Sequence, residues 1–284
     1  RMQTCPMSWW PFKKPAPTVP EVTFISMLPH LEHMYPIYPS TDLRLPWMAE
    51  SEREGHDRLK DISGNRPGGV SAMCSGIVGL HQRGWIVPSW CDIVIETNGD
   101  GVSFKTHSAL PDRSFSNLPS GTPRPITYFA PDVYGGLPSN PIPPNTLKTV
   151  IKFNLPWVVR MSPGWGLLTL PLEYVKEPRF TATIGVLTPR ISQQINPILY
   201  WHVLKGQTLI KAGTPLMRVV AIPLANKFNL SVRSATEEER SFYASQRLFV
   251  SSQYRRPHGV LGRFYDKMMA KFSSEEQAKR QSCD

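Results

Sequence analysis

The chain has 284 residues, which is enough for one large domain or two small ones and for a sizeable core without disulfides. Its formal net charge of +10 favours association with nucleic acid, acidic proteins or anionic surfaces, although charge does not identify a fold. No stretch approaches the ~18 consecutive apolar residues of a membrane span, so none is expected. The four cysteines are scattered without a C-x-x-C pair, which excludes a disulfide scaffold and is typical of a reducing compartment. We expect Cys74 and Cys91 to be small core residues.

Prolines are concentrated near the N-terminus and in residues 111–147. Because proline removes a backbone donor and disfavours helix at the preceding residue, both regions are predicted to be extended arms or ordered loops. We predict a Pro-rich arm over residues 1–47 that packs on a body through apolar side chains, with Trp9 and Trp10 as anchoring contacts. His30 and His33 have the spacing of a metal-binding pair, but flanking prolines favour ordinary polar surface.

The middle of the chain is predicted to form strands. Residues 84–97, "GWIVPSWCDIVIET", alternate in polarity, and Asn98-Gly99-Asp100-Gly101 can form a turn into "VSFKTH", so we predict a hairpin. Asp92 and Glu96 lie on its polar face. They could act as paired carboxylates, although a half-solvated strand places polar residues there in any case.

Further strands are predicted at residues 148–161, 165–174, 179–188, 197–204 and 208–223. Short strands with frequent turns and no helix between them indicate an antiparallel sandwich or distorted barrel. The fold class is therefore predicted as mainly β, with a body over residues 48–225 that contains the Pro-rich loop 111–147.

The strands on either side of residue 163 are joined by a turn. Ser162-Pro163-Gly164 carries proline second and glycine third, as β-turns often do, and Pro156 indicates a bulge or edge position just before it. Ser162 could be a nucleophile only with a general base in reach, and no sequence feature supplies one. We expect replacement of Gly164 to damage folding before any chemistry.

Residues 226–284 are predicted to form a helical tail. Thr236 and Glu239 fit a capping box that begins a helix to about residue 252, and an apolar stripe predicts a second helix over residues 260–280. Basic residues dominate this tail and could contact phosphates or a protein partner, although a helix with a solvated basic face is the favoured interpretation. The basic residues are Arg247, Arg255, Arg256, Arg263, Lys267 and Lys271.

The chain carries none of the motifs G-x-x-x-x-G-K-[ST], G-x-G-x-x-G, G-x-S-x-G and H-E-x-x-H. The familiar phosphate, dinucleotide, hydrolase and zinc-protease signatures are therefore missing. We predict a protein without catalytic residues, cofactor or metal.

Four segments in order resemble an uncharacterised protein family of tailed phages and some bacteria, whose members are often labelled hypothetical or virion proteins. The segments are "YPIYPSTDLRLPWMAE" (35–50), "CSGIVGLHQRGWIVPSWCDIVIETNGDG" (74–101), "FNLPWVVRMSPGWGLLTLPL" (153–172) and "IKAGTPLMRVVAIP" (210–223). The family typically has a Gly-Val-Val-Asp-Thr-Asp-like stretch where this chain has "IGVLTPRISQQINP" (184–197), which contains no acid.

"LIKAGTPLMRVVAIP" is also faintly similar to the terminal strands of the dUTPase and deoxycytidylate deaminase sandwich. The body is accordingly expected to be dUTPase-like or jelly-roll-like. In that superfamily a G-x-I-D hairpin carries the catalytic aspartate, and the corresponding residues 184–190 of this chain have no aspartate. Nucleotide hydrolysis is therefore rejected, since fold analogy does not establish activity.

The resemblance implies a phage setting. We predict a non-enzymatic structural protein of a virion, in the capsid, neck or tail, assembled in the host cytoplasm as an oligomer with other virion proteins. One alternative is a basic nucleic-acid-binding accessory protein. Another is a catalytically degenerate, nucleotide-binding dUTPase-like protein.

Overall fold

The computed structural model describes residues 20–60, 74–108, 110, 124–130, 144–224, 232–237 and 239–241. The chain divides into two compact units, one of residues 1–44 with 83–225 and one of residues 45–82 with 226–284. The first unit contains β1 to β14, and its sheets are antiparallel throughout the described pairs. The predicted fold class, mainly antiparallel β, is confirmed.

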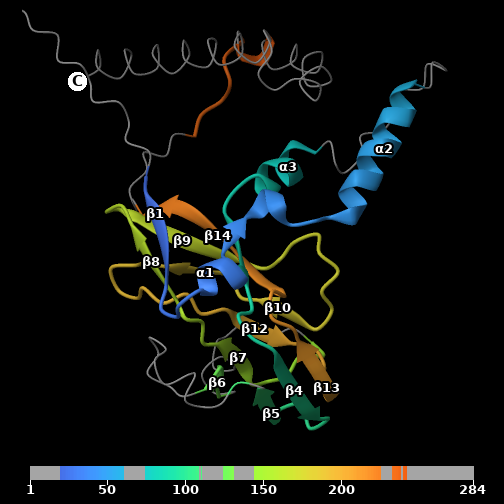
Figure 1. Ribbon diagram of the computed structural model, residues 1–284. Coiled ribbons are helices and arrows are strands. Elements are labelled where there is room, and N and C mark those ends of the chain that lie inside the picture. The colour runs from blue at the N-terminus through green and yellow to red at the C-terminus, as the bar shows by residue number, and fades with distance from the viewer. Residues whose placement is uncertain are drawn as a thin grey trace, which may run out of the picture. The chain divides into compact units, whose positions relative to one another are not determined.

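The described part of the predicted arm contributes strands to the first unit. β1 (Val22–Ser26) pairs with β8 (Trp157–Met161), and β2 (Tyr38–Pro39) forms one edge of a larger sheet. A short helix, α1 (Leu31–Met34), lies between them, and a 3₁₀ turn, η1 (Ser40–Asp42), follows. Figure 1 shows β1 beside β8. Residues 1–19 lie outside the described residues.

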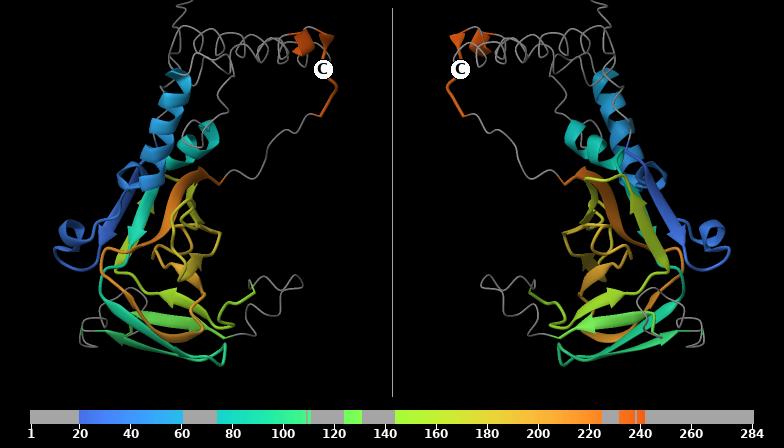
Figure 2. Two further views of the ribbon diagram at one scale, coloured as in Figure 1. Left: turned by 90° about the vertical axis from the view of Figure 1, so that its right-hand side faces the viewer. Right: turned by 90° about the vertical axis from the view of Figure 1, so that its left-hand side faces the viewer.

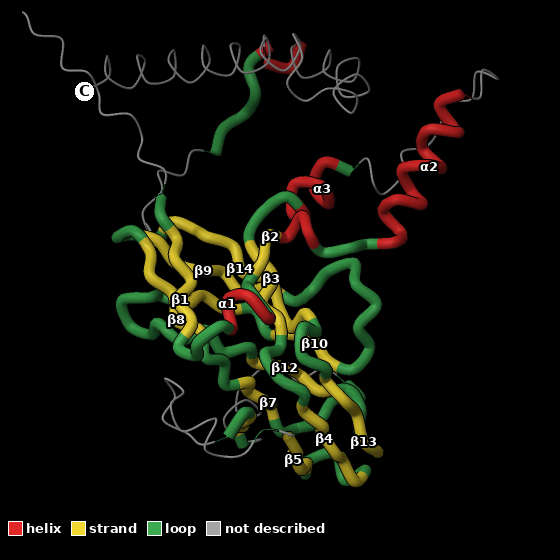
Figure 3. Tube along the Cα trace, in the orientation of Figure 1, coloured by secondary structure: helices red, strands yellow, loops and turns green. Residues whose placement is uncertain are grey.

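Three larger sheets complete the first unit. The five-stranded sheet has the order β11-β9-β14-β3-β2, the four-stranded sheet β10-β12-β7-β6 and the three-stranded sheet β13-β4-β5. Figure 1 shows the three-stranded sheet at one end of this unit and the β1–β8 pair towards the other, and Figure 3 shows how short the strands are relative to their loops. The remaining strands are β3 (Trp85–Pro88), β4 (Ile93–Asn98), β5 (Phe104–Ser108), β6 (Ile126–Phe129), β7 (Val150–Phe153), β9 (Trp165–Leu170), β10 (Phe180–Ala182), β11 (Gly185–Leu187), β12 (Ile198–Trp201), β13 (Lys205–Ile210) and β14 (Pro215–Pro223).

Several runs that we predicted as single strands are two strands in different sheets. Residues 84–97 form β3 and β4, residues 148–161 form β7 and β8, residues 179–188 form β10 and β11, and residues 208–223 form parts of β13 and β14. Figure 2 shows the orange chain of β13 and β14 passing from one sheet into another. The prediction of continuous strands was wrong because Pro88, Pro156 and Gly213 end the regular backbone pattern at the crossings.

The core of the first unit draws side chains from all of these sheets, which makes the unit sandwich-like. Ile93, Phe153 and Trp201 are completely buried, and Phe180 stacks on Trp201 with ring centroids 6.3 Å apart. Burial of each such side chain contributes about 1.5–3 kcal/mol. The cluster fixes the positions of β10 and β12, which carry the candidate site.

The predicted hairpin is formed by β4 and β5. Along β4 the side chains of Ile93, Ile95 and Thr97 are buried, while the intervening ones are partly exposed. At the turn, the Asp100 carboxylate accepts hydrogen bonds from the backbone N–H groups of Val102 and Ser103, each at 2.7 Å. Hydrogen bonds from Ser103 in particular hold the pKa of Asp100 well below its usual range.

The predicted turn after β8 is also present. The Trp165 N–H donates to the Ser162 carbonyl at 3.3 Å, and Gly164 has φ +80°, as the third residue of a type II turn requires. A Cβ on Gly164 would meet no atom within 4 Å. At Gly84, which also has positive φ, a Cβ would lie 2.1 Å from the Val219 carbonyl oxygen.

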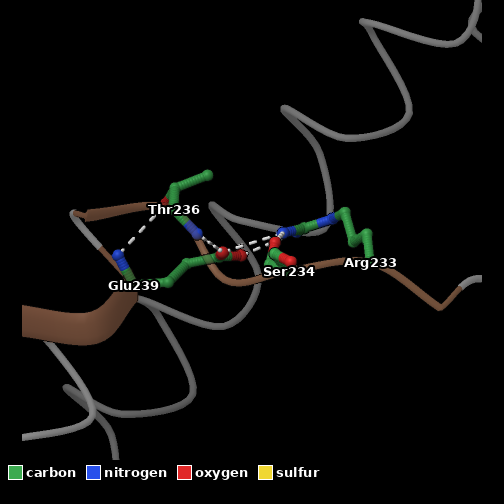
Figure 4. Close-up of polar contacts among 4 residues, drawn as sticks. All are labelled: Arg233, Ser234, Thr236 and Glu239. Atoms are coloured by element: carbon green, nitrogen blue, oxygen red, sulfur yellow. Dashed lines mark hydrogen bonds and ion pairs between the residues drawn. The ribbon is translucent and has the colours of Figure 1, made fainter.

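The second unit contains two helices that the sequence did not predict, α2 (Pro46–Lys60) and α3 (Ser75–His81). Its C-terminal part begins with the predicted capping box (Figure 4). The Thr236 N–H donates to Glu239 Oε2 at 2.7 Å, and the Glu239 N–H donates to Thr236 Oγ1 at 3.2 Å. The adjacent Arg233 guanidinium lowers the pKa of Glu239 to about 2. In the part of the chain that the structure describes, no helix is long and apolar enough to cross a membrane.

Candidate functional site

A groove of about 650 Å³ opens where the chain crosses from β10 to β11. This volume is typical of pockets that bind small molecules. The described residues that line it carry no charged side chain and combine hydroxyl and amide groups with aliphatic ones. They are Thr169, Pro171, Thr181, Ala182, Thr183, Ile184, Gly185, Val186, Leu187, Asn196, Ile198, Tyr200 and Met217.

Strand pairing determines which polar groups reach the groove. Thr181 of β10 and Tyr200 of β12 are cross-strand partners, so their side chains lie on one face of the four-stranded sheet. Burial raises the pKa of the Tyr200 phenol, which therefore stays protonated at neutral pH. The Thr169 hydroxyl is within 3.2 Å of the Gly185 carbonyl and 3.3 Å of the Thr183 carbonyl, so it holds β9 to the crossing.

Thr181 is hydrogen-bonded to a histidine. His202 Nε2 lies 2.8 Å from Thr181 Oγ1, and His202 Nδ1 lies 3.0 Å from Thr146 Oγ1. The Thr146 hydroxyl also lies 3.4 Å from the Pro144 carbonyl, to which it can donate. In a neutral ring one nitrogen donates to one threonine hydroxyl and the other nitrogen accepts from the second threonine, and the two distances fit either tautomer.

These two contacts are consistent with a neutral imidazole. Burial lowers the pKa of His202, which favours the uncharged ring. A hydroxyl that donates to a neutral imidazole keeps its oxygen lone pairs as acceptors. Chemically, the arrangement presents the Thr181 hydroxyl, held by His202, at the wall of a groove whose described lining is uncharged.

Two arginine–glutamate pairs lie in the same unit. Arg179 and Glu177 form a two-point ion pair, with Nε 2.7 Å from Oε1, and Arg179 also donates to the Leu209 carbonyl at 2.7 Å. The hydrogen bonds to Glu177 raise the pKa of Arg179. The buried Arg218 has its Nε 3.9 Å from Glu173, and burial lowers its pKa against the opposing effect of that carboxylate.

The residues considered as catalytic candidates have structural contacts instead. The Ser162 hydroxyl accepts the Glu21 N–H at 2.9 Å, which joins the start of β1 to the turn after β8. The Asp92 carboxylate accepts the Ala212 N–H at 2.7 Å, and Glu96 accepts from Gln207 at 3.1 Å. Asp92 immediately precedes β4, which carries Glu96, and the two carboxylates have different hydrogen-bond partners, as expected for structural polar residues on a half-solvated strand.

The histidine and cysteine candidates form no centre. His33 of α1 is largely exposed and lies 3.7 Å from Glu32, while His30 caps the helix with φ 65°. Within the described ranges, no group of three or more His, Cys, Asp or Glu side chains could hold a metal ion. Cys91 is buried as predicted, and burial raises the pKa of its thiol to about 12, but Cys74 is exposed and the prediction of a core position for it was wrong.

The predicted anchors and basic contacts lie outside the described residues. These are Trp9 and Trp10 of the arm and Arg247, Arg255, Arg256, Arg263, Lys267 and Lys271 of the tail. Their roles and the domain boundaries at residues 47 and 225 stay predictions. Sequence reasoning missed Thr181, His202 and Tyr200, because a threonine, a histidine and a tyrosine far from any motif give no signal until strand pairing brings them together.

Residues 184–187 line the groove, and residues 188–191 follow them. They include β11, which among the described strands pairs with β9 at the edge of its sheet, and a turn in which the Ile191 N–H donates to the Thr188 carbonyl. Ile184, Val186 and Ile191 are 70%, 54% and 87% exposed.

Comparison with known proteins gives little further identification. No family model and no curated protein matches the chain. One solved structure that it resembles is described as "EIAV dUTPase native", with 7% sequence identity, 54% of this chain and 86% of that chain covered, and a TM-score of 0.28. The similarity is faint, as is that of the terminal strands to the dUTPase sandwich.

Proposed function

We propose that the chain is a non-enzymatic structural protein of a bacteriophage virion that contacts neighbouring subunits through residues 184–191. The observation that carries the proposal is the exposure of Ile184, Val186 and Ile191 within this one short segment. Single exposed apolar side chains are common on protein surfaces, whereas three within eight residues of the chain suit a contact surface.

The edge position of β11 supports the same role. Among the described strands, β11 lies at the edge of its sheet, so its outer side is not covered by a further described strand of this unit. Burial of the three apolar side chains in a contact would contribute about 1.5–3 kcal/mol each, before the cost of association. The phage setting, in capsid, neck or tail, comes from the resemblance of the four sequence segments.

Sedimentation equilibrium of the purified chain tests the contact. We expect a concentration-dependent oligomer that becomes monomeric in Val186→Lys. Val102→Lys is a matched control, since Val102 is also partly exposed but lies in the hairpin turn between β4 and β5. A monomeric wild type, or equal association of both variants, would contradict the contact, and a purified particle whose mass spectrum lacks the chain would contradict the virion role.

A nucleic-acid-binding role is the second candidate, and the charges of residues 144–224 favour it. The two acids of this region, Glu173 and Glu177, each face an arginine. The other basic side chains form no ion pair with a described residue, so the excess charge lies on the surface. They are Lys148, Lys152, Arg160, Lys176, Arg190, Lys205 and Lys211.

Fluorescence anisotropy with single- and double-stranded DNA at several salt concentrations tests this second role. A binding protein that neutralises phosphates loses affinity steeply as salt rises. Replacing Arg255, Arg256 and Arg263 with alanine should then weaken binding and reduce the salt dependence. Absent or salt-insensitive binding would exclude the role.

A further inference from the structure

The groove beside β11 has unused hydrogen-bonding capacity. Among the described residues, no partner contacts the Tyr200 hydroxyl, the Asn196 side-chain NH₂ or the Thr183 hydroxyl. These donors and acceptors share the groove with the apolar side chains of Ile198 and Met217. A ligand that suits it must therefore offer both hydrogen-bonding groups and apolar surface.

The charge of the groove restricts the ligand further. Because its described lining carries no charged side chain, a phosphate or carboxylate placed there would lose water without gaining an ionic partner. A purely aliphatic ligand would in turn leave the hydroxyl and amide groups unpaired, which costs about 1–3 kcal/mol for each buried group. Both classes are disfavoured.

We propose that this groove binds an uncharged saccharide. A neutral sugar has a rim of hydroxyl groups and faces of C–H groups, which match the mixture of polar and apolar side chains in the lining. Thr181 Oγ1, which lies 2.8 Å from His202 Nε2 and is held there by it, can form a hydrogen bond with a sugar hydroxyl. Tyr200 and Asn196 supply donors on the neighbouring wall.

An extended peptide is the main competing occupant, and the strand next to the groove disfavours it. A peptide that adds to a sheet edge gains its affinity from a row of backbone hydrogen bonds. β11 has only the three residues Gly185–Leu187, so it offers a short row. The lining instead includes the hydroxyl- and amide-bearing residues Thr181, Thr183, Asn196 and Tyr200, which suit a sugar.

An array of neutral glycans and of sialylated and sulfated glycans, probed with the labelled full-length chain, tests the proposal. We expect retention on neutral glycans, followed by calorimetric titration of the best one. Tyr200→Phe and Thr181→Val should each weaken that affinity about three- to tenfold, the effect of one neutral hydrogen bond. Tyr128→Phe, which changes an exposed tyrosine on β6, should leave it unchanged.

Retention on no neutral glycan, or on acidic glycans alone, would overturn the proposal. Equal affinities for Tyr200→Phe and Tyr128→Phe would also overturn it, because binding would then occur elsewhere. Thermal melting confirms that each variant folds, and if Thr181→Val does not fold, Tyr200→Phe decides the question. Sedimentation of the same samples separates a lost sugar site from a lost subunit contact.

Discussion

The chain crosses between sheets in two different ways. The crossing from β3 to β4 lies beside the crossing from β13 to β14, and backbone hydrogen bonds join the two. The Ser89 N–H donates to the Thr214 carbonyl at 2.8 Å, and the Gly213 N–H donates to the Ser89 carbonyl at 2.7 Å. The crossing from β10 to β11 borders the groove and leaves Thr183 and its neighbours partly exposed.

The difference between the crossings indicates where in this fold a ligand-binding site can lie. Paired crossings satisfy their own backbone groups, so Ser89 is completely buried. The crossing beside β11 is held by the Thr183 N–H, which donates to the Ile198 carbonyl at 2.8 Å, and by the Thr169 hydroxyl, and polar side chains around it line the groove. Substitutions near the paired crossings should therefore affect stability, and substitutions in the groove should affect binding.

The largest loss of stability is expected at Gly84, which directly precedes β3 and packs against Val219 of the neighbouring strand β14. Gly84→Ala would place a Cβ 2.1 Å from the Val219 carbonyl oxygen at a φ of +79°. Overpacking and positive φ together should lower the free energy of unfolding by more than about 3 kcal/mol. Urea denaturation measures the change.

Gly164→Ala is the matched control for Gly84→Ala, since it keeps the positive φ but has open space around the new Cβ. It should cost about 1–2 kcal/mol. If both variants lose the same free energy of unfolding, the close approach of Gly84 to Val219 is not the reason that glycine is needed there. An unchanged melting temperature in the larger substitution Gly164→Val would contradict the role of the turn in folding.

A smaller loss is expected at Ser89. Its hydroxyl donates to the Cys91 carbonyl at 2.9 Å within the buried crossing, so Ser89→Ala should lower the free energy of unfolding by about 1–2 kcal/mol. Ser192→Ala changes an exposed serine and should have almost no effect. If the melting temperature falls equally in both variants, the buried crossing at Ser89 is no more important for stability than an exposed position.

His202 should make stability depend on pH. Its native pKa lies below the usual value of about 6.5, so the unfolded chain binds the proton more readily than the folded one. The contribution of neutral His202 to the free energy of unfolding is present above the usual pKa and is lost as pH falls through the native pKa. The melting temperature should therefore drop between pH 8 and pH 5 by less in His202→Gln than in the wild type.

His107→Gln is the control for that comparison, because His107 lies on the exposed face of β5. Its melting temperature is measured over the same pH range. If His202→Gln keeps the pH dependence of the wild type, burial of the imidazole does not hold it in its neutral form.

The smallest effect on stability is expected at Tyr200. Its hydroxyl contacts no described residue, so Tyr200→Phe should change the free energy of unfolding by less than about 0.5 kcal/mol. Chemical denaturation of the variant beside Ser89→Ala measures the contrast. A loss as large as that of Ser89→Ala would mean that the phenol is part of the packing and not part of an open groove.

The sequence predicted the local elements better than their assembly. Alternating polarity located the hairpin of β4 and β5, and proline and glycine located the turn at Ser162, because both depend on neighbouring residues only. Whether a run stays in one sheet depends on contacts with distant segments. The predicted runs 84–97 and 208–223 therefore passed through Pro88 and Gly213 without revealing that the chain changes sheets there.

The candidate site was less predictable than the fold. The stretch 184–197 was singled out by the acids it lacks, and residues 184–187 and Asn196 of it line the groove. Thr181 lies opposite Tyr200 and within hydrogen-bonding distance of His202, and the pairing of β10 with β12 brings these residues together. Their side chains are ordinary ones for surface strands, so no pattern distinguished them.

The position of β14 has a consequence for synthesis of the chain. β14 is the central strand of its sheet, and it pairs with β9 and with β3, which precedes it by about 130 residues. A nascent chain that has not yet reached residue 223 leaves the facing edges of both strands without a partner. Folding of the first unit should thus be completed late in translation and be slow, as is usual when distant segments must pair.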